Sequence, residues 1–500
     1  MNTPDTPDNR NDGRALFAFE AQQVAAAPLT KAGDGDAPEV TTVPRQRLNT
    51  ALAVALMLIV SAAPLPLGSN RPAFWLGWAA ILFILAAIYL AAITIRQLPL
   101  RASPWQYPVI SASAVAFVLY GFFQTIPLGE GLLGLLPLGT TAPAGPAISI
   151  APGATVVGIL RWTSYAVFFL LMMQVAQNRT RARKMAWFVF FLVTAQASFA
   201  LLSFRFLGET LLTPAQGYSG VVSGTFVNRN SFATFTGMGA VLGLALLLHD
   251  LRTSGGRSPH LASLLSVESI RRAAAWICLA VVLGALFATA SRMGITASVI
   301  ALFLVAVVSF AKGPKRTPRW VFFTFVLALA TIGLLLAVFG QTAIERAIFT
   351  LGGQDGRYDL YVQTLELLRT RPWLGFGFDT FGLAFEQVHR PPVSPDLVWN
   401  RAHSTYLALW VEMGLVFGSL PLVIGAALMV RLGRIVLTAP RDFVLAIAGL
   451  GVMVLAALHS LVDFSLEMSA NVFLFLTIMA LGAGTRLRPQ AKAAKRGAAR

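Results

Sequence analysis

AAAWICLAVVLGALFATASRMGITASVIALFLVAVVSFA, residues 273–311, is an almost unbroken apolar run. As a single α-helix it would extend about 60 Å, twice the roughly 30 Å of a bilayer's hydrocarbon core. Basic residues flank both of its ends, Arg271 and Arg272 before it and Lys312 after it. Because such flanks favour the cytoplasmic side of a membrane, both ends prefer the same side. We therefore expect a helical hairpin that turns back near residues 291–294.

Similar apolar runs recur along the chain. The sequence is 56% hydrophobic and only 12% charged over 500 residues. Backbone polar groups in lipid need partners within their own segment, so spans of this kind are helices. The sequence predicts an all-α integral membrane protein with about 12 transmembrane helices. The predicted spans are residues 48–67, 73–94, 107–127, 155–177, 184–206, 231–249, 273–290, 293–311, 320–340, 404–429, 443–462 and 470–485.

The distribution of lysine predicts the orientation. If both termini are cytoplasmic, every lysine of the chain lies in an inner segment, as the positive-inside rule requires; they are Lys31, Lys184, Lys312, Lys315, Lys492 and Lys495. The net charge of +17 then reflects topology and contact with anionic membrane lipids. A nucleic-acid partner is not expected, because the chain has no basic soluble domain.

Three regions follow from this pattern. Residues 1–46 are polar, without an apolar signal segment, and are predicted to be a disordered cytoplasmic tail. Residues 47–486 form the transmembrane domain, and 487–500 form a basic cytoplasmic tail. Between the ninth and tenth predicted spans lies a long connection on the outer face, residues 341–403, which we call the lid loop. It is too long for a plain turn and is rich in aromatic residues.

The outer side of the predicted bundle carries arginine and no lysine. In GTFVNRNSFATF, residues 224–235, Arg229 lies between Asn228 and Asn230 at the start of a span. Arg292 occupies the predicted hairpin turn, on the same side. Guanidinium binds phosphate oxygens bidentately and keeps its charge when partly dehydrated. A helix N-terminus beside an arginine favours anions, so the pattern predicts a phosphate or diphosphate site.

Two further arginines fall within predicted spans, near their outer ends. They are Arg161 and Arg205. Intramembrane charge is costly and commonly functional, which makes both candidates for substrate binding. Snorkelling to the membrane interface is the alternative explanation for a terminal arginine. Because Arg229 and Arg292 oppose the positive-inside bias, snorkelling explains them less well.

The histidines offer one candidate base. His403 opens the span predicted over 404–429, on the outer side, and Glu412 follows nine residues later, half a helical turn out of phase. The two side chains are therefore not expected to touch. His459 and Asp463 are spaced i, i+4 and are expected to share a helix face. In that pair Asp463 orients His459, which suits a structural role as well as a catalytic one.

No sequence motif for a cofactor is present. The chain lacks HExxH and CxxC motifs, its one cysteine, Cys278, lies in a predicted span, and Gly375–Gly377 is too short for a nucleotide loop. We therefore expect neither a metal nor another cofactor. With no soluble nucleotide-binding domain, ATP or a nucleotide sugar is not the expected donor.

Five motifs occur in order along the chain. They are GTFVNRNSFA (224–233), SRMG (291–294), RPWLGFG (371–377), AHSTYL with a following EMG (402–414), and HSLVDF (459–464). Together they resemble the O-antigen ligase and O-antigen polymerase superfamily of bacterial envelope glycosyltransferases. The resemblance covers roughly residues 155–485.

This resemblance implies a donor glycan on undecaprenyl diphosphate and a metal-independent, inverting transfer at the periplasmic face of the inner membrane. It implies that Arg229 and Arg292 bind the diphosphate and that His403 is the general base on the acceptor hydroxyl. Glu412 would help to shape the site. The acceptor would be another glycan or the lipid A core. Asn228, Asn230, Arg161, Arg205, His459 and Asp463 are the remaining substrate-binding candidates.

A transporter or flippase for a lipid-linked or anionic solute is the alternative class. A bundle of twelve spans suits it, and the arginines would bind the same headgroup. However, the sequence shows no two-fold repeat and few charges in mid-span. Its cations lie at the outer rim rather than in a central cavity, which favours the enzyme.

Overall fold

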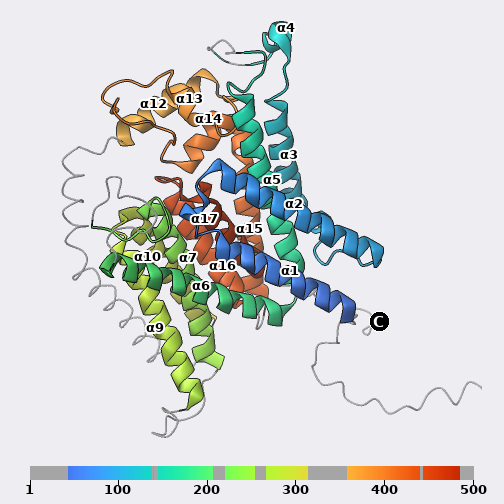
Figure 1. Ribbon diagram of the computed structural model, residues 1–500, viewed down its shortest axis with the longest axis vertical. Helices are drawn as coiled ribbons and strands as arrows, with labels where there is room; N and C mark the ends of the chain where they lie inside the picture. The colour runs from blue at the N-terminus through green and yellow to red at the C-terminus, as the bar shows by residue number, and fades with distance from the viewer. Residues whose placement is uncertain are drawn as a thin grey trace, which may run out of the picture. The chain divides into compact units, whose positions relative to one another are not determined.

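The computed structural model describes residues 43–137, 139, 145–206, 220–253, 266–312, 357–439 and 443–484 (Figure 1). The chain divides into two compact units, Met1–Gln46 and Arg47–Arg500, and the contacts discussed below lie within the second. Most of the predicted N-terminal tail and the predicted C-terminal tail lie outside the described residues. So do the predicted span 320–340 and residues 341–356 of the lid loop.

Every element in these ranges is a helix, and no strand occurs among the described residues. The α-helices are α1 Val43–Ala62, α2 Pro72–Ile95, α3 Pro108–Phe123, α4 Gly129–Leu133, α5 Pro152–Ala176, α6 Arg179–Phe206, α7 Arg229–Thr253, α9 Val267–Ala288, α10 Arg292–Ala311, α12 Arg357–Thr370, α13 Phe381–Phe385, α14 Thr405–Gly418, α15 Leu420–Thr438, α16 Val444–His459 and α17 Ser469–Ala483. Short 3₁₀ helices are η1 Leu67–Ser69, η2 Pro104–Gln106 and η3 Ser465–Glu467.

Many of these helices suit a membrane. Within the described residues, seven are long and apolar enough to cross one: α2, α5, α6, α7, α9, α10 and α15. Four shorter apolar helices, α3, α14, α16 and α17, accompany them. The all-α membrane class is therefore confirmed, while the count of twelve spans stays a prediction.

The hairpin predicted within residues 273–311 is present. Helix α9 ends at Ala288 and α10 begins at Arg292. Between them Ala290 has a φ of 48°, a left-handed conformation that reverses the chain. The length of the apolar run and its basic flanks were thus sufficient to locate the turn.

Helix α7 lies at the centre of one half of the bundle. It packs against α6, α9, α10 and α16, and its apolar stretch is buried throughout. Small residues allow this close approach: a Cβ added at Gly239 would lie 2.3 Å from Val193 Cγ1, and one at Gly243 would lie 2.2 Å from Phe190 Cε2. Small residues at helix contacts are typical of membrane bundles.

The predicted span over residues 404–429 is wrong as a single helix. Helix α14 is kinked at Gly414, which has φ 70° and ψ 167°, and it ends at Gly418. Helix α15 starts again at Leu420, with Pro421 in its first turn. Helix α14 packs against α12, α3 and α13, whereas α15 packs against α3 and α16.

Helices α12, α13 and α14 form a small group that we call the cap, at the top of Figure 1. Its core contains Leu360, Leu367, Phe376, Phe381 and Phe385. The predicted lid loop is therefore a packed helical structure where the structure describes it, and it continues to Gly418. Helix α14 is not among the seven candidate spans.

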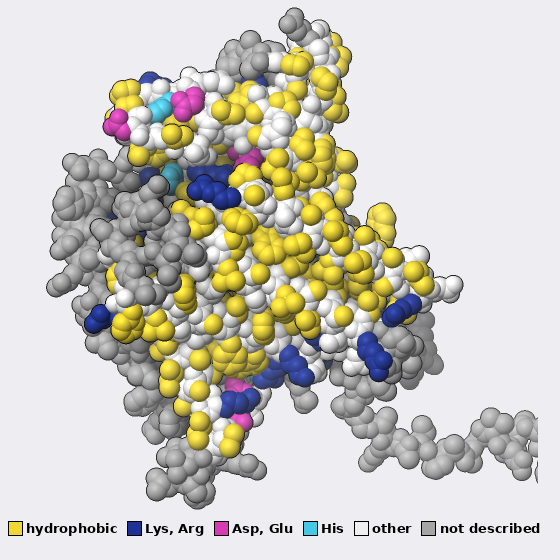
Figure 2. Space-filling model, in the orientation of Figure 1, with side chains coloured by type: hydrophobic (Ala, Val, Ile, Leu, Met, Phe, Trp, Pro, Cys, Tyr) yellow, Lys and Arg dark blue, Asp and Glu magenta, His cyan; other side chains and the backbone are white. Residues whose placement is uncertain are grey.

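The outer surface of the bundle is apolar. Large hydrophobic side chains are exposed on many of its helices, including Ile84 on α2, Leu119 on α3 and Ile277 on α9. Figure 2 shows hydrophobic side chains covering most of the visible face, with basic side chains at its lower margin and in a group below the cap. An apolar surface of this extent suits contact with lipid.

Candidate active site

The first residues of α7 and α10 meet at Asn230. Its side-chain Oδ1 accepts a hydrogen bond from Ser291 Oγ at 2.8 Å, and its Nδ2 donates to Asp463 Oδ1 at 3.0 Å. The two helices pack closely there, because a Cβ added at Gly294 would lie 2.7 Å from Ala233 Cβ. Asn230 thus joins the starts of α7 and α10 to the segment that follows α16.

Arg229 and Arg292 begin these two helices. Arg229 is the first residue of α7 and is half-buried, while Arg292 is the first residue of α10 and is exposed. Asn228 Oδ1 accepts a hydrogen bond from the backbone N–H of Asn230 at 2.8 Å, which holds the first turn of α7. Two arginines and two helix N-termini therefore lie at one end of a packed pair, an arrangement that favours an anion.

His459 and Asp463 do not form the helical pair expected from their spacing, because α16 ends at His459. His459 Nδ1 lies 2.6 Å from Thr234 Oγ1 on α7. The Asp463 carboxylate instead accepts from Asn230 and from Ser465 Oγ. Both side chains are buried, so this arrangement favours their bracing the start of α7 over direct contact with a substrate.

His403 precedes α14 in a left-handed conformation, with φ 50°. Such a conformation is uncommon outside glycine and is kept only where the surroundings impose it. Here Tyr361 donates from its hydroxyl to the His403 carbonyl at 2.9 Å. The imidazole lies edge-to-face with Phe464, with ring centroids 5.0 Å apart. Phe464 follows Asp463 directly, so His403 lies beside the segment that Asn230 also contacts.

A second cluster of charged residues surrounds Arg401, two residues before His403. Arg401 Nη1 lies 3.1 Å from Asp379 Oδ1 and 2.6 Å from Glu467 Oε2. Asp379 also pairs with Arg161 Nη2 at 3.3 Å. The Arg161 guanidinium lies over the ring of Trp75, 4.1 Å from its centroid. Arg161 is therefore held in a buried ion network that links α5, the cap and η3.

Glu412, on α14, lies beside this network. Its Oε1 accepts from the backbone N–H of Phe381 at 3.1 Å, which ties α14 to α13. Burial, and after it the negative charges of Asp379 and Glu467, raise the pKa of Glu412 to about 8. Burial also raises the pKa of Glu467, an effect that Arg401 and Arg161 oppose. The Glu412 carboxyl is therefore mostly protonated near neutral pH.

The RPWLGFG motif brings its backbone into close contact with the backbone of α14. Gly375 and Gly377 have φ of 68° and 110°. A Cβ at Gly375 would lie 2.4 Å from the Glu412 carbonyl oxygen, so no larger residue fits. The Gly377 N–H donates to that same oxygen at 2.9 Å. Gln124, at the end of α3, also donates to it, at 2.9 Å. The motif thus fixes the position of Glu412.

Most aromatic residues of the predicted lid loop are inside the cap. Phe376, Phe378 and Phe381 are buried, while Trp373 and Tyr358 are exposed. The three phenylalanines build the core of the cap and its junction with α3 and α5 and do not line an open surface.

Arg205 lies apart from both clusters. It is exposed near the end of α6, and its guanidinium lies 5.6 Å from the ring centroid of its neighbour Phe206. No contact among the described residues connects it with Asn230 or Arg401. The structure therefore groups nine of the ten candidate residues around the segment 459–467 and the residues that contact it, and leaves Arg205 outside.

Sequence reasoning missed three members of the ion network: Asp379, Arg401 and Glu467. Their partners are far away in sequence, which a single chain does not reveal. The available signal was proximity to the motifs, since Asp379 follows RPWLGFG closely and Arg401 opens RAHSTYL. In the described part of the chain, no group of three or more His, Cys, Asp or Glu residues is placed to hold a metal ion.

Residues 277–422 match the family model described as O-antigen ligase. The match runs from within α9 through the cap to the start of α15 and includes Arg292, His403 and Glu412. The match covers less than a third of the chain, and the fold around it is that of a helical membrane protein. The matched segment is thus similar to O-antigen ligases, the family that the five motifs resemble, although the match is shorter than the resemblance and leaves Arg229 outside. A search of curated proteins found no match.

Proposed function

We propose that this protein transfers a glycan from undecaprenyl diphosphate to an acceptor hydroxyl at the periplasmic face of the bacterial inner membrane. The observation that carries the proposal is the pairing of the starts of α7 and α10. The 2.8 Å bond between Ser291 and Asn230 sets Arg229 and Arg292 at the same end of two adjacent helices. Two guanidinium groups and two helix dipoles match the charge of a diphosphate.

In the proposed reaction the acceptor oxygen attacks the anomeric carbon of the donor sugar. His403, as a neutral imidazole, takes the proton of the acceptor hydroxyl as the new C–O bond forms. The bond from the anomeric carbon to the diphosphate breaks, and undecaprenyl diphosphate leaves with the electron pair. Arg229 and Arg292 stabilise that departing charge. Attack opposite the leaving group inverts the anomeric centre, without a metal ion.

Glu412 has a positioning role in this scheme. Its side-chain carboxyl accepts a hydrogen bond from Phe381, and its backbone carbonyl accepts from Gly377 and Gln124. Both groups are therefore hydrogen-bonded within the protein. It fixes α14 within the cap, and α14 directly follows His403. The acceptor is another glycan chain in a polymerase and the lipid A core in a ligase.

The test is to measure donor affinity and turnover separately for purified enzyme in nanodiscs. Arg229→Lys and Arg292→Lys are expected to lose most activity, since a point charge does not replace the bidentate fork. His403→Ala is expected to keep donor affinity and to lower turnover by roughly 10²–10⁴-fold. Arg434→Lys, an exposed arginine on α15, is the matched control. Near-normal transfer by all three variants would refute the proposal.

A deletion strain separates the two acceptors. Lipid-linked glycans are extracted from it and their chain lengths compared with those of the parent strain. Accumulation of donors that carry a single repeat unit identifies a polymerase. Long donor-linked chains that never reach lipid A identify a ligase.

A further inference from the structure

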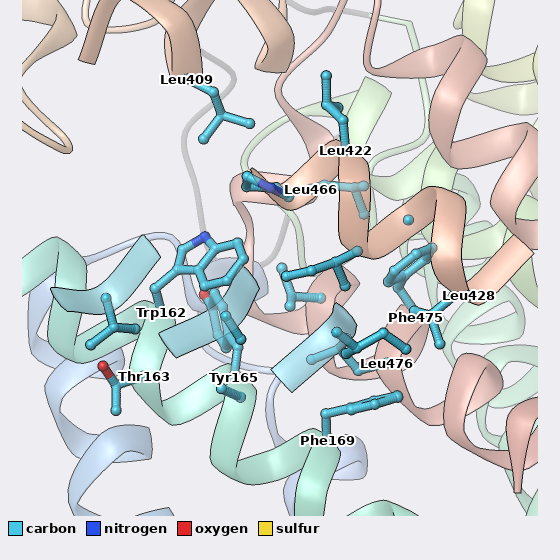
Figure 3. Close-up of a pocket in the computed structure, with 18 of the residues that line it drawn as sticks. Trp162, Thr163, Tyr165, Phe169, Leu409, Leu422, Leu428, Leu466, Phe475 and Leu476 are labelled. Atoms are coloured by element: carbon cyan, nitrogen blue, oxygen red, sulfur yellow. The ribbon is translucent and has the colours of Figure 1, made fainter. Parts of the chain in front are cut away.

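A large apolar cavity lies between α3, α5, α15, α16 and α17. Its volume is about 860 Å³. Figure 3 shows side chains from these helices, among them Trp162, Phe169 and Leu476, around the shared space. Protein interiors are close-packed and leave few voids larger than a water molecule. A space of this size therefore points to a ligand rather than to imperfect packing.

The cavity is elongated along the helices. On α5 its lining extends from Arg161 to Met173, which is about 18 Å at 1.5 Å per residue. On α3 it extends from Ile110 to Leu119. Leu119 and Met429 line the cavity and are also exposed on the outer surface. The cavity thus runs parallel to the helices for more than half of a bilayer's roughly 30 Å core, and a chain from the lipid phase has access to it.

Charged groups line one end only. Among the described lining residues, the charged side chains are Arg161, Asp379, Arg401, Glu412 and Glu467. Arg161 lies at the first of the α5 lining positions, and the other four come from the cap, its connection to α14, and η3. The lining further along α5, α15 and α17 carries no charge and, apart from Thr163 and Tyr165, is apolar. A molecule that fits this cavity has a hydrocarbon chain and a polar head at a single end.

The charged end is balanced in charge. Two arginines face three carboxyl groups, and Glu412 is mostly neutral near pH 7, because burial and the neighbouring carboxylates raise its pKa to about 8. Arg161 is 4% exposed, and its Nε and Nη1 atoms have no hydrogen-bond partner within the described residues. The end therefore offers both donors and acceptors without net positive charge. Hydroxyl groups match such a surface, whereas a phosphate would meet the carboxylates.

We propose that this cavity binds the hydrocarbon chain of a membrane amphiphile with an uncharged, hydroxyl-bearing head. Arg161 donates hydrogen bonds to that head, and carboxyl oxygens of the network accept from it. The site is distinct from the proposed diphosphate site, since none of the described residues that line the cavity belongs to α7 or α10. Binding of the amphiphile does not require glycan transfer, so it can be tested independently of the proposed function.

The probe is an alkyl maltoside that carries a diazirine in its alkyl chain. Wild-type protein in nanodiscs is illuminated without donor, and the labelled residues are mapped by mass spectrometry. Saturable labelling of the cavity-lining faces of α3, α5 and α15, removed by excess unlabelled alkyl maltoside, is the expected result. Labelling that does not saturate, or that is confined to outward-facing residues, overturns the proposal.

Two glycines on α15 give a matched pair of variants. Gly425 lines the cavity, and a Cβ added there would meet only Met453 Sδ, at 3.8 Å. Gly433 is outside the cavity lining and has no atom within 4 Å of an added Cβ. Gly425→Phe is expected to reduce labelling roughly tenfold or more, because it fills the cavity, while Gly433→Phe leaves labelling unchanged. Equal labelling of the two variants contradicts the proposal.

A replacement variant and a second probe complete the test. If Gly425→Phe does not fold, Ala166→Leu on α5 replaces it, since Ala166 also lines the cavity. An alkyl phosphate with the same diazirine-bearing chain tests whether the site prefers an uncharged or an anionic head. The maltoside is expected to label the cavity at lower concentrations than the phosphate. The reverse order shows that the head is anionic and overturns the assignment of its class.

Discussion

Arg401→Met is the sharpest test of the ion network. One Arg401 nitrogen lies 3.1 Å from Asp379 and 2.6 Å from Glu467, and the side chains of the three residues are 21%, 12% and 13% exposed. Removing the cation leaves two carboxylates with only Arg161 to offset them. Breaking a buried pair in this way typically costs about 3–5 kcal/mol. We expect a loss of that size in the free energy of unfolding at pH 8.

The loss of stability should be larger at high pH than at low pH. Burial raises the pKa of Glu467 and Arg401 opposes that rise, so Arg401→Met raises it further. An acid with a raised pKa destabilises the folded state only where it is ionised. The deficit is therefore largest above that pKa and shrinks as the pH falls through it. Measurements at pH 8 and pH 5 should differ accordingly.

The assay is SDS-induced unfolding in mixed micelles, with Arg369→Met on the exposed face of α12 as the control. A double variant, Arg401→Met with Glu467→Gln, removes both partners and should be more stable than Arg401→Met alone. The expected coupling energy is about 0.5–3 kcal/mol, the range for residues in one salt-bridge network. An Arg401→Met protein as stable as the control, or strictly additive effects, would refute the reasoning.

Two further predictions concern the motif glycines and the orientation. Gly375→Ala should destabilise the protein by more than about 1 kcal/mol, because its φ is 68° and its Cβ would lie 2.4 Å from a carbonyl oxygen. Gly77→Ala on α2, where nothing lies within 4 Å, should be neutral or slightly stabilising in the same SDS-unfolding assay. In a Cys278→Ser background, an impermeant maleimide added outside spheroplasts should label Asp396→Cys and not Arg434→Cys; the opposite pattern would invert the proposed topology.

Hydropathy located the helices well but not the break in the last long apolar run. It predicted the hairpin at 291–294, because length and flanking charge both bear on it. Residues 404–429 are apolar throughout, so the same reasoning made them one helix. The break depends on the backbone of Gly414 and on the new start at Leu420. Neither changes the hydropathy, and glycine within a membrane helix is common enough to pass unnoticed.

The candidate site was predictable for those residues that lie in short, recognisable sequence motifs. Arg229, Asn230 and His403 each stand in a recognisable stretch, and the structure brings their surroundings together. The ion network was not predictable, because its pairs join Arg161 to Asp379 and Arg401 to Glu467 across long separations. A single sequence records which residues are charged but not which of them meet. The cavity is likewise a property of five helices at once.

The segment from His459 to Glu467 contacts both the residues around Asn230 and the ion network around Arg401. At one end Asp463 contacts Asn230, and at the other Glu467 contacts Arg401, with Phe464 against His403 between them. A ligand that shifted this segment from one side would alter its contacts on the other, and the two proposed sites would then be thermodynamically linked. Linkage is reciprocal: any factor by which an occupied cavity strengthens diphosphate binding is also the factor by which bound diphosphate strengthens retention of the amphiphile. Because the factor is the same in both directions, the coupling itself favours neither molecule as the first to bind.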